Sequence, residues 1–214
     1  MPTIDPTAGT WKRFIVDKNY SIPVPISDVS PQFNQYVEEV AYRTKHRTEQ
    51  NDMDIAFFAG GFGTEGPSGI WQNILYKESL HRHLSDKKYA HLQKILAFSV
   101  ADSFYECWKQ KYIYWYKRPS MYPNDIKMSM NNPNFPSYPS GHSTISATAY
   151  TVLSSLIPEK SAIFKDYAVR AKDSRINAGV HFSFDNENGF ALGQKIGNDI
   201  INKLELEDID LIKN

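Results

Sequence analysis

After residue 30, apolar residues recur at spacings of three and four along most of the chain, as in helices that bury one face. The clearest stripe predicts a long helix that begins near Ser85. This helix should end by Lys117, because the residue before a proline is disfavoured in the helical region. Its apolar positions are Tyr89, Leu92, Ile95, Leu96, Val100, Phe104 and Trp108.

The same spacing, with caps and breakers, predicts further helices. Ser30-Pro31 is typical of a helix start, and Gly179 of a helix end. No sustained alternation of apolar and polar residues follows residue 30. We therefore predict a mainly α fold, a helical bundle of about six helices with an extended N-terminal arm that carries at most one short strand. The predicted parts are the arm (1–29), a single catalytic domain (30–214), and helices over 30–44, 49–59, 70–81, 140–157, 161–178 and 185–204.

Two sets of glycines stand out. Gly189, Gly193 and Gly197 repeat every fourth residue along the last predicted helix, and each costs about 1 kcal/mol there relative to alanine. We expect this stripe to pack closely against another helix. The segment 60–69 holds five glycines, but no GK[ST] follows, so a phosphate-binding P-loop is not indicated. A turn, or a mobile rim of an active site, is the better interpretation.

The composition of the chain excludes several classes of protein. The 214 residues include 24 basic and 24 acidic side chains, so the net charge gives no footprint for nucleic acid or acidic lipid. No apolar run approaches the roughly 20 residues of a membrane-spanning helix. Cys107 is the only cysteine, so an intrachain disulfide is excluded. We expect Cys107 to be an inert residue of the core.

Cellular location stays open at this point. The first ten residues lack the basic start and apolar core of a signal peptide, so we expect none in this chain. A chain that begins after a removed leader would look the same, and an exported origin is therefore an alternative.

Three separated clusters carry the polar chemistry. Together they contain three permanent cations, two imidazoles, a hydroxyl and a glycine turn. Arginine offers bidentate donors, lysine a point charge, and a helix start offers free backbone N–H groups, which suits a tetrahedral oxyanion such as phosphate or vanadate. The clusters are Lys111-x6-Arg118-Pro119, Pro139-Ser140-Gly141-His142 and Ser174-Arg175-x5-His181-x3-Asp185.

Spacing within the clusters adds geometry. Lys111 and Arg118 are seven residues apart, about two helical turns, so both are expected on one face at the end of the long helix. His181 and Asp185 are four apart, close enough for the carboxylate to orient the imidazole. Taken singly, each cluster has an ordinary interpretation, such as a capping serine at Ser140 or a surface His–Asp pair. All three in one chain favour an anion site.

Two chemistries suit such a site. In phosphoryl transfer an imidazole attacks while the cations stabilise the equatorial oxygens. Alternatively, vanadate stays in the same place as a cofactor and supports halide oxidation by peroxide. A third, non-enzymatic alternative is an anion-binding protein. The clusters alone do not separate the first two, because their protein requirements nearly coincide.

Over roughly Asp102–Gly197 the pattern resembles the superfamily of type 2 phosphatidic-acid phosphatases, bacterial class A acid phosphatases and vanadium-dependent haloperoxidases. The run DSFYECWKQKYIYWYKRP places Trp108 three residues before Lys111, as in haloperoxidases. Phe135, five residues before Ser140, and the segment SRINAGVHFSFD are also similar to that branch. The resemblance therefore favours a haloperoxidase-like enzyme, with a soluble acid phosphatase as the alternative.

This resemblance implies roles for individual residues. His142 would be the general acid–base, His181 the axial vanadate ligand, and Trp108 and Phe135 would line a halide pocket, with a plain core role as the alternative for Trp108. In a phosphatase His181 would be the nucleophile, His142 would protonate the leaving group, and Asp185 would orient His181. Vanadate, or phosphate in the same site, would be held by Lys111, Arg118, Ser140, Gly141, Arg175 and His181.

The resemblance also bears on partners. The implied substrates are peroxide with a halide, or a phosphate ester. Haloperoxidases of this type usually carry a second helical bundle before the catalytic one, whereas only about 80 residues precede the long helix here. We therefore expect a homo-oligomer in which a partner subunit covers the exposed bundle face.

Overall fold

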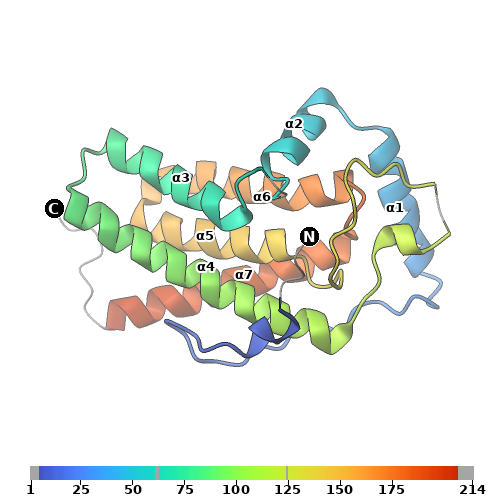
Figure 1. The fold of residues 1–214 in the computed structure, drawn as a ribbon, viewed down its shortest axis with the longest axis horizontal. Helices are drawn as coiled ribbons and strands as arrows, with labels where there is room; N and C mark the ends of the chain where they lie inside the picture. Colours follow the sequence, from blue (N-terminus) through green and yellow to red (C-terminus); the bar gives the residue numbers. More distant parts are fainter. Residues whose placement is uncertain (1–4, 61–62, 124, 207–214) are drawn as a thin grey trace.

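The computed structural model describes residues 5–60, 63–123 and 125–206, which form seven α-helices and three short 3-10 helices (Figure 1). The predicted mainly α fold is confirmed, and each of the seven α-helices corresponds to one of the helices that the spacing predicts. The described part contains no strand, so the arm carries none over residues 5–29. The elements are η1 (Pro6–Thr10), α1 (Phe33–Lys45), α2 (Glu49–Phe57), α3 (Pro67–His81), α4 (Asp86–Tyr114), η2 (Pro119–Met121), α5 (Gly141–Leu156), η3 (Pro158–Lys160), α6 (Ser161–Asn177) and α7 (Ser183–Leu206).

Helix α5 is the central element of the bundle, and it is buried along nearly its whole length. The glycine stripe of α7 packs against it, as the sequence predicts. A Cβ added at Gly189 would lie 2.7 Å from the Ser140 carbonyl oxygen, and one at Gly193 would collide with the backbone of Thr144. The stripe is therefore used inside the chain. The expected homo-oligomer stays a prediction.

The end of α4 differs from the prediction. The helix stops at Tyr114, and Trp115 adopts a left-handed conformation with φ of 49°. Arg118 therefore lies in extended backbone ahead of η2 and not on the helix. The expectation that Lys111 and Arg118 share the last turns of one helix is wrong, because the chain leaves the helix four residues before Arg118.

The N-terminal arm is fastened to α4 by buried polar groups. Both carboxylate oxygens of Asp102 accept backbone N–H groups, those of Phe14, Ile15 and Val16. Arg13 pairs with the buried Glu106 at 2.8 Å. Each carboxylate is thus compensated, as burial requires. The proposed division into an arm and a single catalytic domain stays a prediction.

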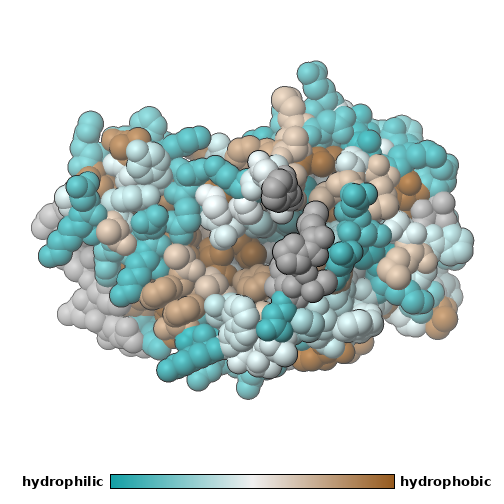
Figure 2. Space-filling model, viewed as in Figure 1, coloured by the Kyte–Doolittle hydropathy of each residue, from teal (hydrophilic) through white to brown (hydrophobic). Residues whose placement is uncertain are grey.

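Four helix ends meet at one end of the bundle. The C-terminal ends of α4 and α6 and the N-terminal ends of α5 and α7 point toward it (Figure 1). The loop of residues 115–140 also runs there, so all three sequence clusters converge. Among the described helices none has an apolar stretch long enough to cross a bilayer. In Figure 2 hydrophilic side chains cover most of the visible face, and hydrophobic ones gather in a hollow between α3 and α4.

Candidate active site

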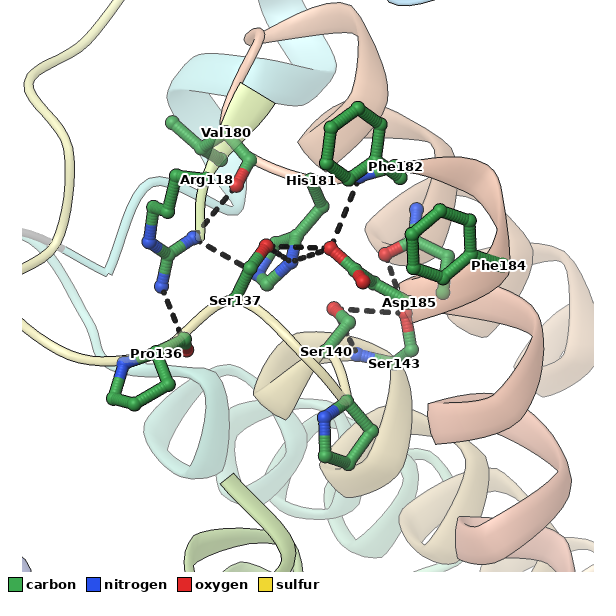
Figure 3. A network of polar contacts seen from close by, with 12 residues as sticks. Arg118, Pro136, Ser137, Ser140, Ser143, Val180, His181, Phe182, Phe184 and Asp185 are labelled. Carbon is green, nitrogen blue, oxygen red and sulfur yellow. Dashed lines mark hydrogen bonds and ion pairs between the residues drawn. The ribbon is translucent and has the colours of Figure 1, made fainter. Parts of the chain in front are cut away.

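A buried group of three side chains lies at the start of α7 (Figure 3). His181 Nδ1 is 3.0 Å from Asp185 Oδ2, and the Ser137 hydroxyl donates to the same oxygen at 2.5 Å. The Phe182 N–H donates to it as well, at 3.0 Å. Because a carboxylate only accepts, Nδ1 carries the imidazole proton and Nε2 keeps its lone pair. The i, i+4 spacing therefore orients His181 as predicted.

The Nε2 atom of His181 faces Arg118. The distance from Nε2 to Arg118 Nη1 is 3.3 Å, and a guanidinium can only donate, so Nε2 is the acceptor. Arg118 also donates to the carbonyl oxygens of Val180 at 2.7 Å and Phe135 at 3.2 Å. These backbone contacts hold the guanidinium beside His181 although Arg118 comes from a loop (Figure 3).

Lys111 reaches the same site from the last turns of α4. Its Nζ donates to the carbonyl oxygens of Pro136 at 2.8 Å and Ser137 at 2.7 Å. The side chain is completely buried, and burial lowers the pKa of Lys111 below its ordinary value. An ammonium has three donors, so two carbonyls leave one for another acceptor.

Arg175 approaches from the end of α6. It is buried, with weak contacts to the carbonyl oxygens of Ile55 at 3.3 Å and Ala59 at 3.5 Å. No carboxylate pairs with it within the described residues. Burial, and then the charge of Arg118, lowers the pKa of Arg175 to about 10. A buried guanidinium without an anionic partner is costly unless an anion is supplied from outside.

Helix α5 presents its N-terminus to this cluster. Ser140 is the N-cap, and its Oγ accepts from the Ser143 N–H at 3.4 Å and the Ser143 hydroxyl at 3.1 Å. Gly141 follows, and a Cβ added there would lie 4.0 Å from the Cε atom of Lys111. The first N–H groups of a helix have no intrahelical partner and attract anions. Ser140 is thus a cap and also a neighbour of the cations.

His142 lies in the first turn of α5, against the end of α2. Its Nε2 is 2.8 Å from the Phe58 carbonyl oxygen, which means that Nε2 carries the proton. Desolvation, and then the charge of Arg175, holds the pKa of His142 well below its ordinary value. A Cβ added at Gly60 would come within 3.3 Å of the imidazole, so this part of the glycine-rich loop is a rim of the site, as one alternative predicted.

Residues 61 and 62 of that loop lie outside the described residues.

The two predicted halide-pocket residues pack on each other. The rings of Trp108 and Phe135 are 4.7 Å apart between centroids. The Phe135 ring lies 5.3 Å from Lys111 Nζ and 5.0 Å from the guanidinium carbon of Arg118. Trp108 is buried behind it and donates from Nε1 to the carbonyl oxygen of Asp5 at 3.0 Å. Phe135 is therefore the ring that faces the cations.

The charges of the site do not balance. Lys111, Arg118 and Arg175 are 0%, 2% and 1% exposed, and Asp185 is the carboxylate that acts on the first two. Burial raises the pKa of Asp185 above its ordinary value, and burial with the nearby cations lowers the pKa of His181 well below its own. Three cations against one carboxylate leave two positive charges, which fits a bound dianion.

Two groups of the site were not predicted from the sequence. Ser137 touches both Asp185 and His181, and its carbonyl receives Lys111, yet no motif singled it out. The Phe58 carbonyl orients His142, and a backbone oxygen leaves no trace in the sequence. The only sequence signal for Ser137 was its position two residues before the cluster Pro139-Ser140-Gly141-His142.

Comparisons with known proteins concern the family and the fold. The family model described as the PAP2 superfamily matches residues 94–198, which include all three clusters. This match agrees with the resemblance to that superfamily that the sequence indicates. Comparison with the curated proteins found no sequence match.

Solved structures give the same fold. A bacterial vanadium-dependent iodoperoxidase is similar with a TM-score of 0.80 at 23% identity, over 95% of this chain and 58% of that one. A bacterial vanadium-dependent chloroperoxidase gives 0.74 at 12% identity, over 95% and 55%. The transmembrane PAP2-type phosphatidylglycerolphosphate phosphatase of Bacillus subtilis gives 0.62 at 18%, over 86% and 91%. The chain thus spans little more than half the length of the two peroxidases.

Proposed function

We propose that this protein is a vanadate-dependent haloperoxidase that oxidises a halide with hydrogen peroxide. The observation that carries the proposal is the Phe135 ring, which lies against both Lys111 and Arg118 and is backed by Trp108. Halide oxidation needs a partly apolar place beside the bound oxyanion, where cations and an aromatic wall replace the hydration shell of the halide. Ester hydrolysis has no such need.

The folds of both peroxidases and phosphatases are similar to this one. The TM-score is higher with the iodoperoxidase, at 0.80, than with the Bacillus subtilis phosphatase, at 0.62. At these identities the comparison speaks for the fold, and the choice of branch rests on the aromatic wall.

The residues of the site fit vanadate. The surplus of two positive charges matches a dianion. The lone pair of His181 Nε2 accepts from Arg118 in the vanadate-free protein and would bond to the dianion once Arg118 donates to the oxygens of the anion. Lys111, Arg118, Arg175, Ser140 and the Gly141 N–H would hold its oxygens, and phosphate would fit the same donors. Bound vanadate supplies the Lewis acidity that activates hydrogen peroxide.

The net reaction converts halide, hydrogen peroxide and one proton into hypohalous acid and water. The halide loses two electrons and the peroxide gains them. Within the chain, Asp185 and Ser137 keep His181 in the tautomer that has its lone pair on Nε2, the nitrogen that would bond to the anion. His142 exchanges the proton, and because the Phe58 carbonyl holds its Nε2–H, Nδ1 is the nitrogen free to do so.

A second candidate is a phosphomonoesterase. The observation in its favour is the same Nε2 atom of His181, which is oriented by Asp185 and lies beside Arg118 as a nucleophile would. His142 would then protonate the leaving group. In both candidates the cations would have the same role, which is to stabilise the negative charge on the oxygens of the anion.

A paired assay separates the candidates. Vanadate-loaded protein is tested for bromide and iodide oxidation with peroxide, and vanadate-free protein for hydrolysis of p-nitrophenyl phosphate. We expect halide oxidation to require vanadate and to be competed by phosphate. Hydrolysis without halide oxidation would support the phosphatase, and neither activity, with anion binding retained, would support an anion-binding protein.

A further inference from the structure

The thioether of Met130 lies against one cation of the anion site. Its Sδ atom is 3.5 Å from Arg175 Nη1, and because a thioether has no proton to give, Arg175 donates and the sulfur accepts. Arg175 is the buried cation that pairs with no carboxylate within the described residues. Among the methionines in the same part of the chain, Met130 alone accepts a hydrogen bond from a cation of the site.

The other acceptors around Arg175 are neutral oxygens. Nε donates to the Ser174 hydroxyl at 3.1 Å, Nη2 to the Ile55 carbonyl at 3.3 Å, and Nη1 to the Ala59 carbonyl at 3.5 Å. A thioether sulfur is a weaker acceptor than any of these oxygens. The Nη1 donor that points at Met130 is therefore the one that a stronger acceptor, such as an anion oxygen, captures most easily.

The Met130 side chain is accessible and can shift its position. It is partly exposed to solvent and packs beside Ile55 and Val180 in a small apolar cluster. The loop is anchored next to it, because the Ser129 N–H donates to the Ala178 carbonyl at 3.3 Å. A methionine side chain is unbranched and has three rotatable bonds. The sulfur can therefore move while the backbone stays in place.

We propose that Met130 is a site of oxidation by hydrogen peroxide, and that its sulfoxide takes the Arg175 donor away from the oxyanion. The proposal rests on the proposed haloperoxidase function, which brings peroxide to this site. A lone pair of the sulfur bonds to one peroxide oxygen as the O–O bond breaks. The proton of that oxygen joins the departing hydroxide as water. The sulfur loses two electrons and the peroxide gains them.

The oxidised side chain changes the acceptor that Arg175 contacts. Oxidation converts the apolar thioether into a polar sulfoxide, whose oxygen is a stronger acceptor than the sulfur was. The flexible side chain turns this oxygen toward Nη1, and an anion then competes with the chain itself for that donor. Loss of one charged hydrogen bond weakens phosphate binding about tenfold. The change is reversible, because methionine sulfoxide reductases restore the thioether.

The test uses the vanadate-free protein, with inorganic phosphate as the probe of the anion site. The protein is treated with hydrogen peroxide, which is then removed. Peptide mass spectrometry maps the oxidised methionines, and calorimetry measures phosphate affinity. We expect oxidation at Met130, phosphate binding about tenfold weaker, and recovery after reductase treatment. Because neither vanadate nor halide enters the measurement, its failure is distinct from failure of the haloperoxidase proposal.

Two variants and a control locate the effect. Met130→Leu should bind phosphate as the unmodified protein does, and peroxide should no longer weaken the binding. Met130→Gln brings a carbonyl oxygen to Arg175 without any oxidation, so its phosphate binding should be weak before peroxide is added. Met128→Leu removes the neighbouring methionine, which packs against the same apolar cluster, and should stay as sensitive to peroxide as the unmodified protein.

Three results would overturn the proposal. In the first, Met130 stays reduced while Met53 and Met121, which are 52% and 63% exposed, are oxidised. In the second, Met130 is oxidised and phosphate affinity is unchanged. In the third, Met130→Leu remains as sensitive to peroxide as the unmodified protein. If Met130→Leu fails to fold, Met130→Gln decides, and phosphate affinity equal to that of the unmodified protein would overturn the proposal as well.

Discussion

The Ser137 hydroxyl donates to Asp185 Oδ2 over 2.5 Å, the oxygen that also faces His181 Nδ1. This bond supports the charged form of a buried carboxylate, whose other oxygen, Oδ1, has no partner among the described residues. The His–Asp pair predicted from spacing is therefore part of a group of three.

Ser137→Ala should slow turnover about tenfold or more, because Asp185 loses a donor that favours its ionised form. The pKa of Asp185, already raised by burial, should rise further, so the acid limb of the pH–rate profile should move to higher pH. Ser99→Ala is the control, since that buried serine bonds only within α4, to the Ile95 carbonyl. A lower rate with an unchanged pH profile would mean that Ser137 is merely structural.

The sequence predicted correctly those features that depend on residues close together in the chain, such as helix caps and glycine packing. The helix ends at Ser140 and Gly179 and the packing of Gly193 follow from caps and glycines, and the structure has them. Arg118 was misplaced because nothing local shows that the helix stops at Tyr114, with a tryptophan where glycine would be expected. The Phe58 carbonyl could not be predicted, because it depends on how α2 packs against α5.

Arg175→Met should weaken phosphate binding by about ten- to hundredfold, the effect of losing one charged hydrogen bond. The vanadate-free protein should keep its stability within about 1 kcal/mol or become more stable, because the variant removes a buried cation that lacks a carboxylate partner. Thermal melting over a phosphate titration measures both quantities.

Arg170→Met is the matched control on the same helix. Arg170 pairs with Asp54 at 2.6 Å, so its loss should cost stability and leave the phosphate-dependent shift intact. If Arg175→Met lowers stability strongly and keeps the phosphate shift, the guanidinium serves the fold and not the anion.

Phe135→Ala should reduce bromide oxidation by more than it reduces any hydrolysis of p-nitrophenyl phosphate. The reason is that this ring faces both Lys111 and Arg118, where a halide would lie. Trp108→Ala should also reduce bromide oxidation, but by less, because Trp108 acts by supporting Phe135. Phe104→Ala, further back in the same row of rings, serves as the control. If bromide oxidation and ester hydrolysis fall in parallel, these rings serve only to pack the core.

The vanadate-free protein should lose stability as the pH falls below about 6.5. Burial and the nearby cations Lys111, Arg118 and Arg175 hold the pKa of His142 and the pKa of His181 well below that value. The unfolded chain therefore binds more protons than the folded protein at low pH. For each pH unit of acidification, each imidazole lowers the free energy of unfolding by up to about 1.4 kcal/mol.

Asp185 acts with the opposite sign, because its raised pKa lets the folded protein take up a proton before the unfolded chain does. Urea unfolding between pH 7.5 and 5.5 should therefore be compared between variants. His142→Gln and His181→Asn should each show a shallower pH dependence than the unmodified protein. The exposed control His91→Gln should not, and an equal slope in all four proteins would show that folding does not lower the pKa of the buried imidazoles.

His181 and three buried cations are proposed to hold one oxyanion. A crystal structure of the protein soaked in orthovanadate, with vanadium located by its anomalous scattering, tests this directly. We expect one strong peak within bonding distance of His181 Nε2, with Lys111, Arg118 and Arg175 around it, and no such peak in His181→Asn. A peak elsewhere, or one that survives unchanged in that variant, would contradict it.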